Sequence, residues 1–273
     1  SSENDSSSSS AARSEGFDEE EFEAKCKLRE EMKPFFRLEL LPNLKKFKIS
    51  QWFLSTPLYP LGSFVTDGFA ELKNLQDFQL YLTHRPVGTM YLFKGFFKLP
   101  LLRKFSFNIQ FIKGEEWALL EQFLKEQTDL EALVISEKDG FVNRKAYIKQ
   151  SFYVGNIIRD LDNKPNLKSL ELKFPFGSLE TLSKGFSRLK MQNQLETLRL
   201  EASDDTITSD QKSWKRVEGL CNFIVNQRDS LKTLQIWIPL VLEEKIINHL
   251  GKAISNLYNL KDLYLSINCS YII

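Results

Sequence analysis

The sequence predicts an α/β solenoid of about eight repeats, with a curved parallel β-sheet on the inside and helices on the outside. The first observation behind this prediction is a frame of leucine, two residues, an apolar residue, any residue and a second apolar residue, which recurs eight times. The second is the spacing of the frames, which start 31, 27, 28, 37, 28, 36 and 29 residues apart. The third is that segments with apolar residues three and four positions apart lie between the frames. A period of this size is typical of solenoids, whose repeats stack to bury a continuous core.

Each frame predicts one strand because its last two apolar residues are two positions apart, as in a strand with one buried face. The leading leucine is expected at the corner where a helix turns into the strand. The eight frames are Leu44/Phe47/Ile49, Leu75/Phe78/Leu80, Leu102/Phe105/Phe107, Leu130/Leu133/Ile135, Leu167/Leu170/Leu172, Leu195/Leu198/Leu200, Leu231/Leu234/Ile236 and Leu260/Leu263/Leu265.

An asparagine precedes the leading leucine in four of the frames, at Asn43, Asn74, Asn166 and Asn259. Asparagine tolerates the left-handed backbone conformation that ends many helices. We therefore expect these four residues to adopt that conformation at the corners.

The segments between the frames predict helices, since their apolar residues form stripes with helical spacing. The stripes are Trp117, Leu120 and Leu124; Val217, Leu220 and Ile224; and Ile246, Leu250, Ile254 and Leu257. Glycines fall within or beside these helices, where a residue without a side chain lets a helix approach its neighbour closely, although glycine costs about 1 kcal/mol of helix propensity. They are Gly68, Gly95, Gly185, Gly219 and Gly251.

The period near 28 residues, with a full helix in each repeat, resembles the ribonuclease-inhibitor-like class of leucine-rich-repeat proteins. Segments such as GFAELKNLQDFQLYL (68–82) and LGKAISNLYNLKDLYLSINCSYI (250–272) are similar to the large repeat families of ciliated protozoa. The resemblance covers roughly residues 41–270; it implies the fold far more than the function. The asparagine or cysteine that usually follows each strand in that class is matched only by Asn268, so we expect less regular turns.

Three regions are predicted along the chain. Residues 1–14 form a flexible, serine-rich tail that cannot bury enough surface to offset its ordering entropy. Residues 15–40 form an N-terminal capping region, with a charged helix over 17–33, and residues 41–273 form the repeat domain. The sequence opens without methionine, which we interpret as a trimmed start or a fragment.

The sequence predicts no catalytic, cofactor-binding or metal-binding residues. Its two histidines, His84 and His249, lie in separate repeats away from any ligand-like cluster, and we expect a partly buried structural role for His249. No phosphate-binding glycine loop or hydrolase motif occurs. Cys26, Cys221 and Cys269 are few and far apart, which favours a reducing compartment. We therefore expect a cytoplasmic protein, or alternatively a cytoskeletal or ciliary one.

Binding residues are expected on the concave face, where the residues between the buried strand positions project. Its first end is basic, its middle is small and apolar, and its far end is aromatic, the residue type that dominates interface energetics. For Trp237 an alternative is packing under the neighbouring loop with Pro239. Two long repeats add loops at 136–150 and 201–214, which are expected on a binding rim or as solvated loops. The predicted partner-binding residues are Lys46, Lys48, Tyr81, Lys104, Val134, Arg199, Trp237 and Tyr264.

The expected function is that of a non-catalytic protein-interaction module or scaffold subunit, with a protein partner of unknown identity. Two alternatives are the substrate-recognition part of a larger signalling or ubiquitin-ligase protein, and nucleic-acid binding through the basic first repeats. Net charge is +1, and acids alternate with the bases, which argues against nucleic acid. No apolar run approaches the ~20 residues of a membrane span. Few residues follow the last strand, so we expect its edge to be covered by a partner, a second copy or missing sequence.

Overall fold

The fold is taken from a computed structural model of the 273-residue chain. The residues that it describes are Lys27 and the ranges 37–51, 66–82, 89–109, 114–137, 153–174, 179–202, 215–238 and 244–267. The predicted tail and almost all of the predicted capping region therefore lie outside the described residues. So do most residues of the two predicted rim loops.

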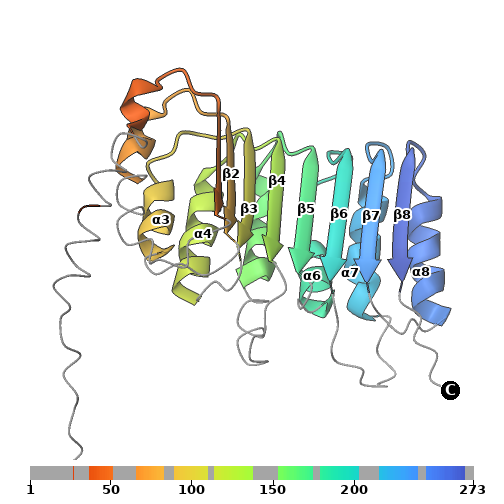
Figure 1. Ribbon diagram of the computed structural model, residues 1–273. Helices are drawn as coiled ribbons and strands as arrows, with labels where there is room; N and C mark the ends of the chain where they lie inside the picture. Colours follow the sequence, from red (N-terminus) through yellow and green to blue (C-terminus); the bar gives the residue numbers. More distant parts are fainter. Residues whose placement is uncertain are drawn as a thin grey trace, which may run out of the picture.

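Eight strands form one parallel sheet in which each strand pairs with the next along the chain (Figure 1). Every strand has six residues and begins two positions after a leading leucine, as the repeat frame predicts. The fold class is thus an α/β solenoid of about eight repeats. The strands are β1 (Lys46–Gln51), β2 (Asp77–Leu82), β3 (Lys104–Ile109), β4 (Ala132–Glu137), β5 (Ser169–Phe174), β6 (Thr197–Ala202), β7 (Thr233–Ile238) and β8 (Asp262–Ile267).

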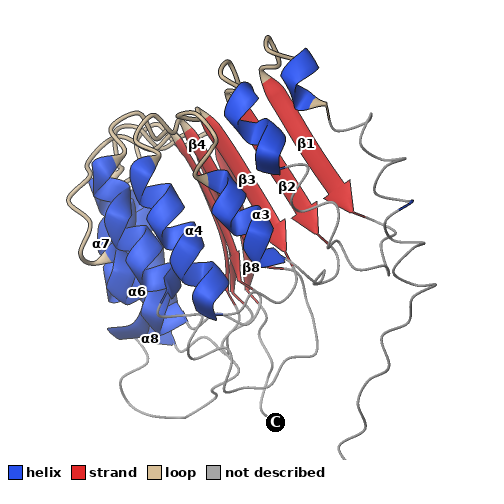
Figure 2. Ribbon diagram, turned by 90° about the vertical axis from the view of Figure 1, so that its left-hand side faces the viewer, coloured by secondary structure: helices blue, strands red, loops and turns tan. Residues whose placement is uncertain are grey.

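The helices lie together against one face of the sheet, as Figure 2 shows from the side. Their described lengths differ, and two of the 3-10 turns directly follow α-helical residues, at 66–68 and 153–159. The helical elements with described bounds are η2 (Leu38–Leu40), η3 (Phe69–Glu71), α3 (Thr89–Phe96), α4 (Gly114–Glu126), η4 (Asp160–Asn163), α6 (Leu179–Phe186), α7 (Lys215–Asn226) and α8 (Glu244–Ser255).

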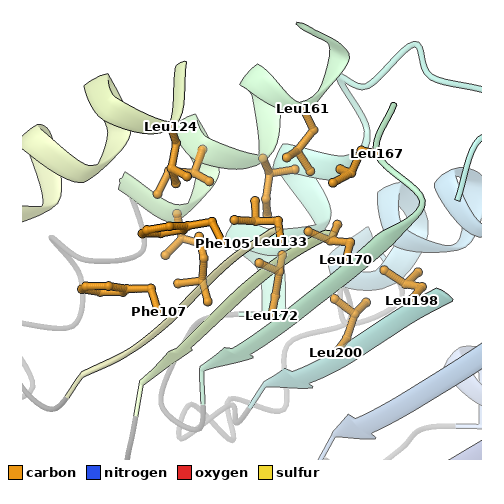
Figure 3. Packing of buried hydrophobic residues seen from close by; sticks show 14 of the residues in the cluster. Phe105, Phe107, Leu124, Leu133, Leu161, Leu167, Leu170, Leu172, Leu198 and Leu200 are labelled. Atoms are coloured by element: carbon orange, nitrogen blue, oxygen red, sulfur yellow. The ribbon is translucent and has the colours of Figure 1, made fainter. Parts of the chain in front are cut away.

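The core lies between the sheet and the helices. The register pairs the frame positions of successive strands, so that Phe105, Leu133, Leu170 and Leu198 are consecutive neighbours across the sheet. These side chains are fully buried and point towards the helices (Figure 3). Because each repeat buries its apolar face only against its neighbours, this row of contacts makes the repeats mutually dependent.

The glycine prediction is confirmed at four positions and wrong at one. A methyl group added to Gly219 would lie 2.1 Å from the backbone oxygen of Ser183, and one added to Gly95 would lie 2.1 Å from the Thr66 side chain. Gly68 and Gly185 also face close neighbours. At Gly251 nothing lies within 4 Å, so no close approach explains that glycine.

The prediction of left-handed asparagines at the corners is wrong. Among the described residues other than glycine, only Asn193 has a positive φ, at 48°. Instead, the side-chain amides of two of the four asparagines donate to the preceding repeat. The Asn74 amide donates to the carbonyl oxygen of Pro42 at 2.8 Å, and the Asn259 amide to that of Asp229 at 2.6 Å.

Buried polar side chains form a second set of links between repeats at the corners. Gln127 and Lys164 stand three residues before a leading leucine, a position that holds Leu72, Leu99 or Leu257 in other repeats. The Gln127 side-chain oxygen accepts from the Leu102 amide at 2.8 Å, and Lys164 Nζ donates to the Leu124 and Gln127 carbonyl oxygens at 2.5 and 3.0 Å.

The next two repeats make similar links from other positions: half-buried Gln194 directly precedes a leading leucine, and buried Gln227 stands four residues before one. The Gln194 side chain donates to the carbonyl oxygens of Lys164 and Leu167, at 2.6 and 3.1 Å. The Gln227 oxygen accepts from the backbone amides of Gln194 and Leu195 at 2.9 and 3.0 Å, and its nitrogen donates to the Met191 carbonyl oxygen. We call Gln127, Lys164, Gln194 and Gln227 the corner residues. They satisfy backbone groups that the turns leave without partners, as buried polar groups require.

Candidate binding face

The face of the sheet opposite the described helices carries the outward side chains of the strands, and we call it the open face. It corresponds to the predicted concave face. Side chains alternate along each strand, so that residues of β5 and β6 are buried or half-buried in turn. The register aligns the outward residues in three rows across the sheet. From β1 to β8 the rows are Lys46, Asp77, Lys104, Ala132, Ser169, Thr197, Thr233, Asp262; Lys48, Gln79, Ser106, Val134, Glu171, Arg199, Gln235, Tyr264; and Ser50, Tyr81, Asn108, Ser136, Lys173, Glu201, Trp237, Ser266.

The first end of the open face, over β1 to β3, is basic. Lys46 and Lys104 flank Asp77 in the register. The Asp77 carboxylate lies 3.3 Å from Lys46 Nζ and accepts from the Gln79 amide at 3.1 Å, and only 16% of its side chain is exposed. Lys48 Nζ lies 4.8 Å from the centroid of the Tyr81 ring, a cation–π contact. This end therefore has three exposed lysines and one carboxylate, Asp77, which is already bound by Lys46 and Gln79.

The middle of the open face combines small apolar residues with a compact ionic cluster. Val134 is half-buried on β4 and pairs in register with Glu171 of β5. The Glu171 carboxylate lies 2.7 Å from Lys173 Nζ and 3.2 Å from Arg199 Nη1. The glutamate side chain is 14% exposed, so the two bases hold it against the sheet. Arg199 Nε is buried and has no hydrogen-bond partner within the described part of the chain.

The far end of the open face is aromatic. Trp237 of β7 is 42% exposed and Tyr264 of β8 is 58% exposed. Trp237 pairs in register with Glu201 and Ser266, and Tyr264 pairs with Gln235, so the two aromatic residues are diagonal neighbours. Pro239, the partner in the alternative packing of Trp237, lies outside the described residues. Single exposed aromatic side chains are common on protein surfaces, but two that are neighbours on one face form a patch of the kind found at binding surfaces.

All eight predicted binding residues lie on the open face, in three groups. Lys46, Lys48, Tyr81 and Lys104 lie together on β1 to β3, and Trp237 and Tyr264 lie together on β7 and β8. Val134 and Arg199 lie between these groups on β4 and β6, separated by β5. The register therefore confirms a common face but separates it into a basic end and an aromatic end.

Known proteins give no indication of the family or function of this chain. No family model matches the chain, and no curated protein matches it. Among solved structures, the chain is similar to a Bacteroides fragilis protein determined as a structural genomics target, with 13% identity and a TM-score of 0.41. The match covers 93% of this chain and 72% of that chain. A likeness this weak supports no inference about function.

Four carboxylates on the open face, Asp77, Glu171, Glu201 and Asp262, were not among the predicted binding residues. Asp77 and Glu171 hold the neighbouring lysines and Arg199, while Asp262 accepts from the Thr233 hydroxyl at 3.2 Å. The signal that could have identified them is the alternation of the strands, which puts each at an outward position. The pairing of Asp77 with Lys46 and of Glu171 with Arg199 joins different strands, so it depends on the register and could not be read from one strand alone.

Groups with reactive chemistry are scarce in the described part of the chain. Within the described ranges no three histidine, cysteine or acidic side chains lie close enough together to hold a metal ion. Cys221 is buried in α7, and burial, together with the charge of Glu218, raises the pKa of its thiol to about 11. The thiolate, which is the reactive form, is therefore rare at neutral pH.

Two further expectations can be compared with the structure. His249 is exposed on α8, so the expectation of a partly buried position was wrong: its place on the helix turns it away from the stripe formed by Ile246 and Leu250. His84 lies outside the described residues. In the parts of the chain that the structure describes, no helix is both long and apolar enough to cross a membrane.

Proposed function

We propose that this chain is a non-catalytic protein-interaction module, or a scaffold subunit, that holds a protein partner on the open face. In this proposal the repeats are leucine-rich repeats of the ribonuclease-inhibitor-like class, and the loops after β4 and β6 contribute to the rim of the site. The supporting observation is the pair Trp237 and Tyr264, which are 42% and 58% exposed on adjacent strands. Aromatic residues in this setting bury large areas at low entropic cost when a partner covers them.

The charges of the open face favour a protein partner over a nucleic acid. Asp77 lies between Lys46 and Lys104, and Glu171 neutralises Arg199, so no unbroken basic stripe crosses the sheet. A nucleic-acid surface requires such a stripe, because phosphate contacts supply most of the affinity. A protein surface of mixed charge has no such requirement.

The proposal is tested with a partner captured by the tagged full-length chain, identified by mass spectrometry and purified. Its Kd is then measured for the wild type, for the double variant Trp237→Ala/Tyr264→Ala, and for Tyr258→Ala. Tyr258 is 70% exposed in the turn before β8, away from the open face, and is the matched control. We expect the double variant to lose about 2–4 kcal/mol of binding free energy and the control to change it by less than about 0.5 kcal/mol.

If the double variant and the wild type bind equally and have the same melting temperature, Trp237 and Tyr264 are not part of the binding site. If deletions within 138–150 or 203–214 then abolished binding, the rim loops alone would hold the partner. In a separate measurement, Lys46→Glu/Lys48→Glu should mainly slow association, and the effect should shrink at high salt.

A further inference from the structure

The charged residues of the open face are segregated along the solenoid. Over β1 to β3 the three rows contain three lysines and one aspartate, a net charge of +2. Over β5 to β8 they contain two bases and three acids, a net charge of −1. Between these ends, β4 contributes only Ala132, Val134 and Ser136. The net charge of the open face is therefore positive on one side of β4 and negative on the other.

The basic end has cationic groups that its own acid does not neutralise. Asp77 is held by Lys46 and Gln79 and is largely covered. Lys104 is exposed on the neighbouring strand, and within the described residues it forms no ion pair. Lys48 contacts the Tyr81 ring, which supplies no formal negative charge. This end is suited to carboxylate side chains.

The aromatic end has the opposite preference. Trp237 pairs in register with Glu201, and Tyr264 follows Asp262 by two positions on the same strand, so each exposed ring has a carboxylate nearby on the open face. The face of an exposed aromatic ring attracts lysine and arginine side chains, and neighbouring carboxylates strengthen that attraction. This end is suited to a basic side chain, arginine above all, which also stacks on aromatic rings.

We infer that the open face binds an extended protein segment with segregated charges, its acidic side chains over β1 to β3 and a basic side chain over Trp237 and Tyr264. The inference rests on the proposed function and adds the chemistry and the orientation of the partner. Strands lie about 4.8 Å apart, so β2 and β8 are separated by about 29 Å. An extended segment of about nine residues spans that distance.

The test uses two synthetic peptides of the same composition and the full-length protein. The segregated peptide has a run of glutamates at one end, a glycine–serine spacer of about six residues and a pair of arginines at the other end. In its isomer the glutamates and arginines alternate. We expect the segregated peptide to bind at least about tenfold tighter than the isomer. Equal affinities would overturn the inference.

Orientation is tested with a photo-cross-linking group placed at either end of the segregated peptide. The acidic end should cross-link to peptides from β1 to β3, and the basic end to peptides from β7 and β8; the reverse pattern, or no pattern, would overturn the inference. The variant Lys46→Glu/Lys48→Glu/Lys104→Glu should abolish the preference for the segregated peptide. The matched control Lys94→Glu/Lys125→Glu/Lys252→Glu changes the same charge on helices α3, α4 and α8 and should leave the preference intact.

The outcomes separate this inference from the proposed function. If the peptides fail but the captured partner still depends on Trp237 and Tyr264, the inference is wrong and the proposed function stands. If the partner is indifferent to every open-face substitution, the proposed function itself is wrong. A single-stranded oligonucleotide that binds tighter than the segregated peptide would overturn both.

Discussion

The Lys164 ammonium nitrogen lies 3.0 Å from the carbonyl oxygen of Gln127, and the two residues occupy the same position in successive repeats. Both stand where three other repeats bury a leucine, and both use their polar ends to bind the backbone of the preceding repeat. The corner therefore tolerates a polar residue because the stacking of repeats presents backbone groups to it.

Lys164 should make the free energy of unfolding depend on pH in the alkaline range. Burial lowers the pKa of its amine from 10.5 to about 8, with the charge of Asp160 opposing the shift. Between these pH values the unfolded chain binds the proton and the folded chain does not, so this residue's contribution to the free energy of unfolding increases as pH rises from about 8 to 10.5. Relative to Lys164→Met, the wild type should gain up to about 3 kcal/mol over that range.

Urea unfolding of both proteins at several pH values measures this difference, since other titrating groups are common to the two. A difference that stays constant from pH 8 to 10.5 would mean that Lys164 remains charged in the folded protein.

The hydrogen bonds of Gln227 should contribute strongly to the stability of the fold. Replacement by alanine leaves the Gln194 and Leu195 amides and the Met191 carbonyl without their partner, and Gln227 itself is fully buried. We expect Gln227→Ala to lower the free energy of unfolding by about 2–4 kcal/mol. The control is Gln235→Ala on the open face, which should change it by less than about 0.5 kcal/mol. Chemical denaturation measures both, and equal effects would contradict the prediction.

Gly219 and Gly251 form a matched pair in two neighbouring helices. Alanine at 219 would place a methyl group against the Ser183 backbone, which cannot move aside as a flexible side chain can, and should destabilise the protein by about 1–3 kcal/mol or more. Alanine at 251 meets nothing within 4 Å and should stabilise the protein by about 0.5–1 kcal/mol through helix propensity. Thermal melts should therefore shift in opposite directions; a shift in the same direction would refute the packing of α7 against α6.

Leu170 tests the repeat frame itself. It is fully buried on β5, so Leu170→Asp places an unpaired charge in the core and should prevent cooperative folding. Ser169→Asp puts the same side chain one position earlier, on the open face, and should leave the circular dichroism spectrum and a cooperative melt intact. A folded Leu170→Asp protein with an unchanged melting temperature would show that the frame is misplaced.

The sequence by itself determined the number of strands, their start and which face of the sheet each side chain occupies. The reason is local: a period of two in each frame sorts residues such as Leu170 and Glu171 to opposite faces of a strand, whatever the neighbouring strand contains. The same periodicity put all eight predicted binding residues on one face. Burial also requires a neighbouring repeat, since Leu263 and Leu265 hold frame positions on β8 and are 48% and 38% exposed.

Only the tertiary structure decided the contacts between repeats. The corner asparagines were expected to adopt the left-handed backbone conformation, but Asn74 and Asn259 instead donate to carbonyl oxygens about 30 residues earlier in the chain. In the sequence, Gln127 and Lys164 are polar residues at a position where other repeats have leucine. Their role becomes clear only in the stacked structure, where the preceding repeat supplies backbone groups for them to bind. On the open face, the partners of Asp77 and Glu171 follow from the register across β1 to β6. A hydrogen bond or ion pair depends on distances between distant segments, and no single repeat contains that information.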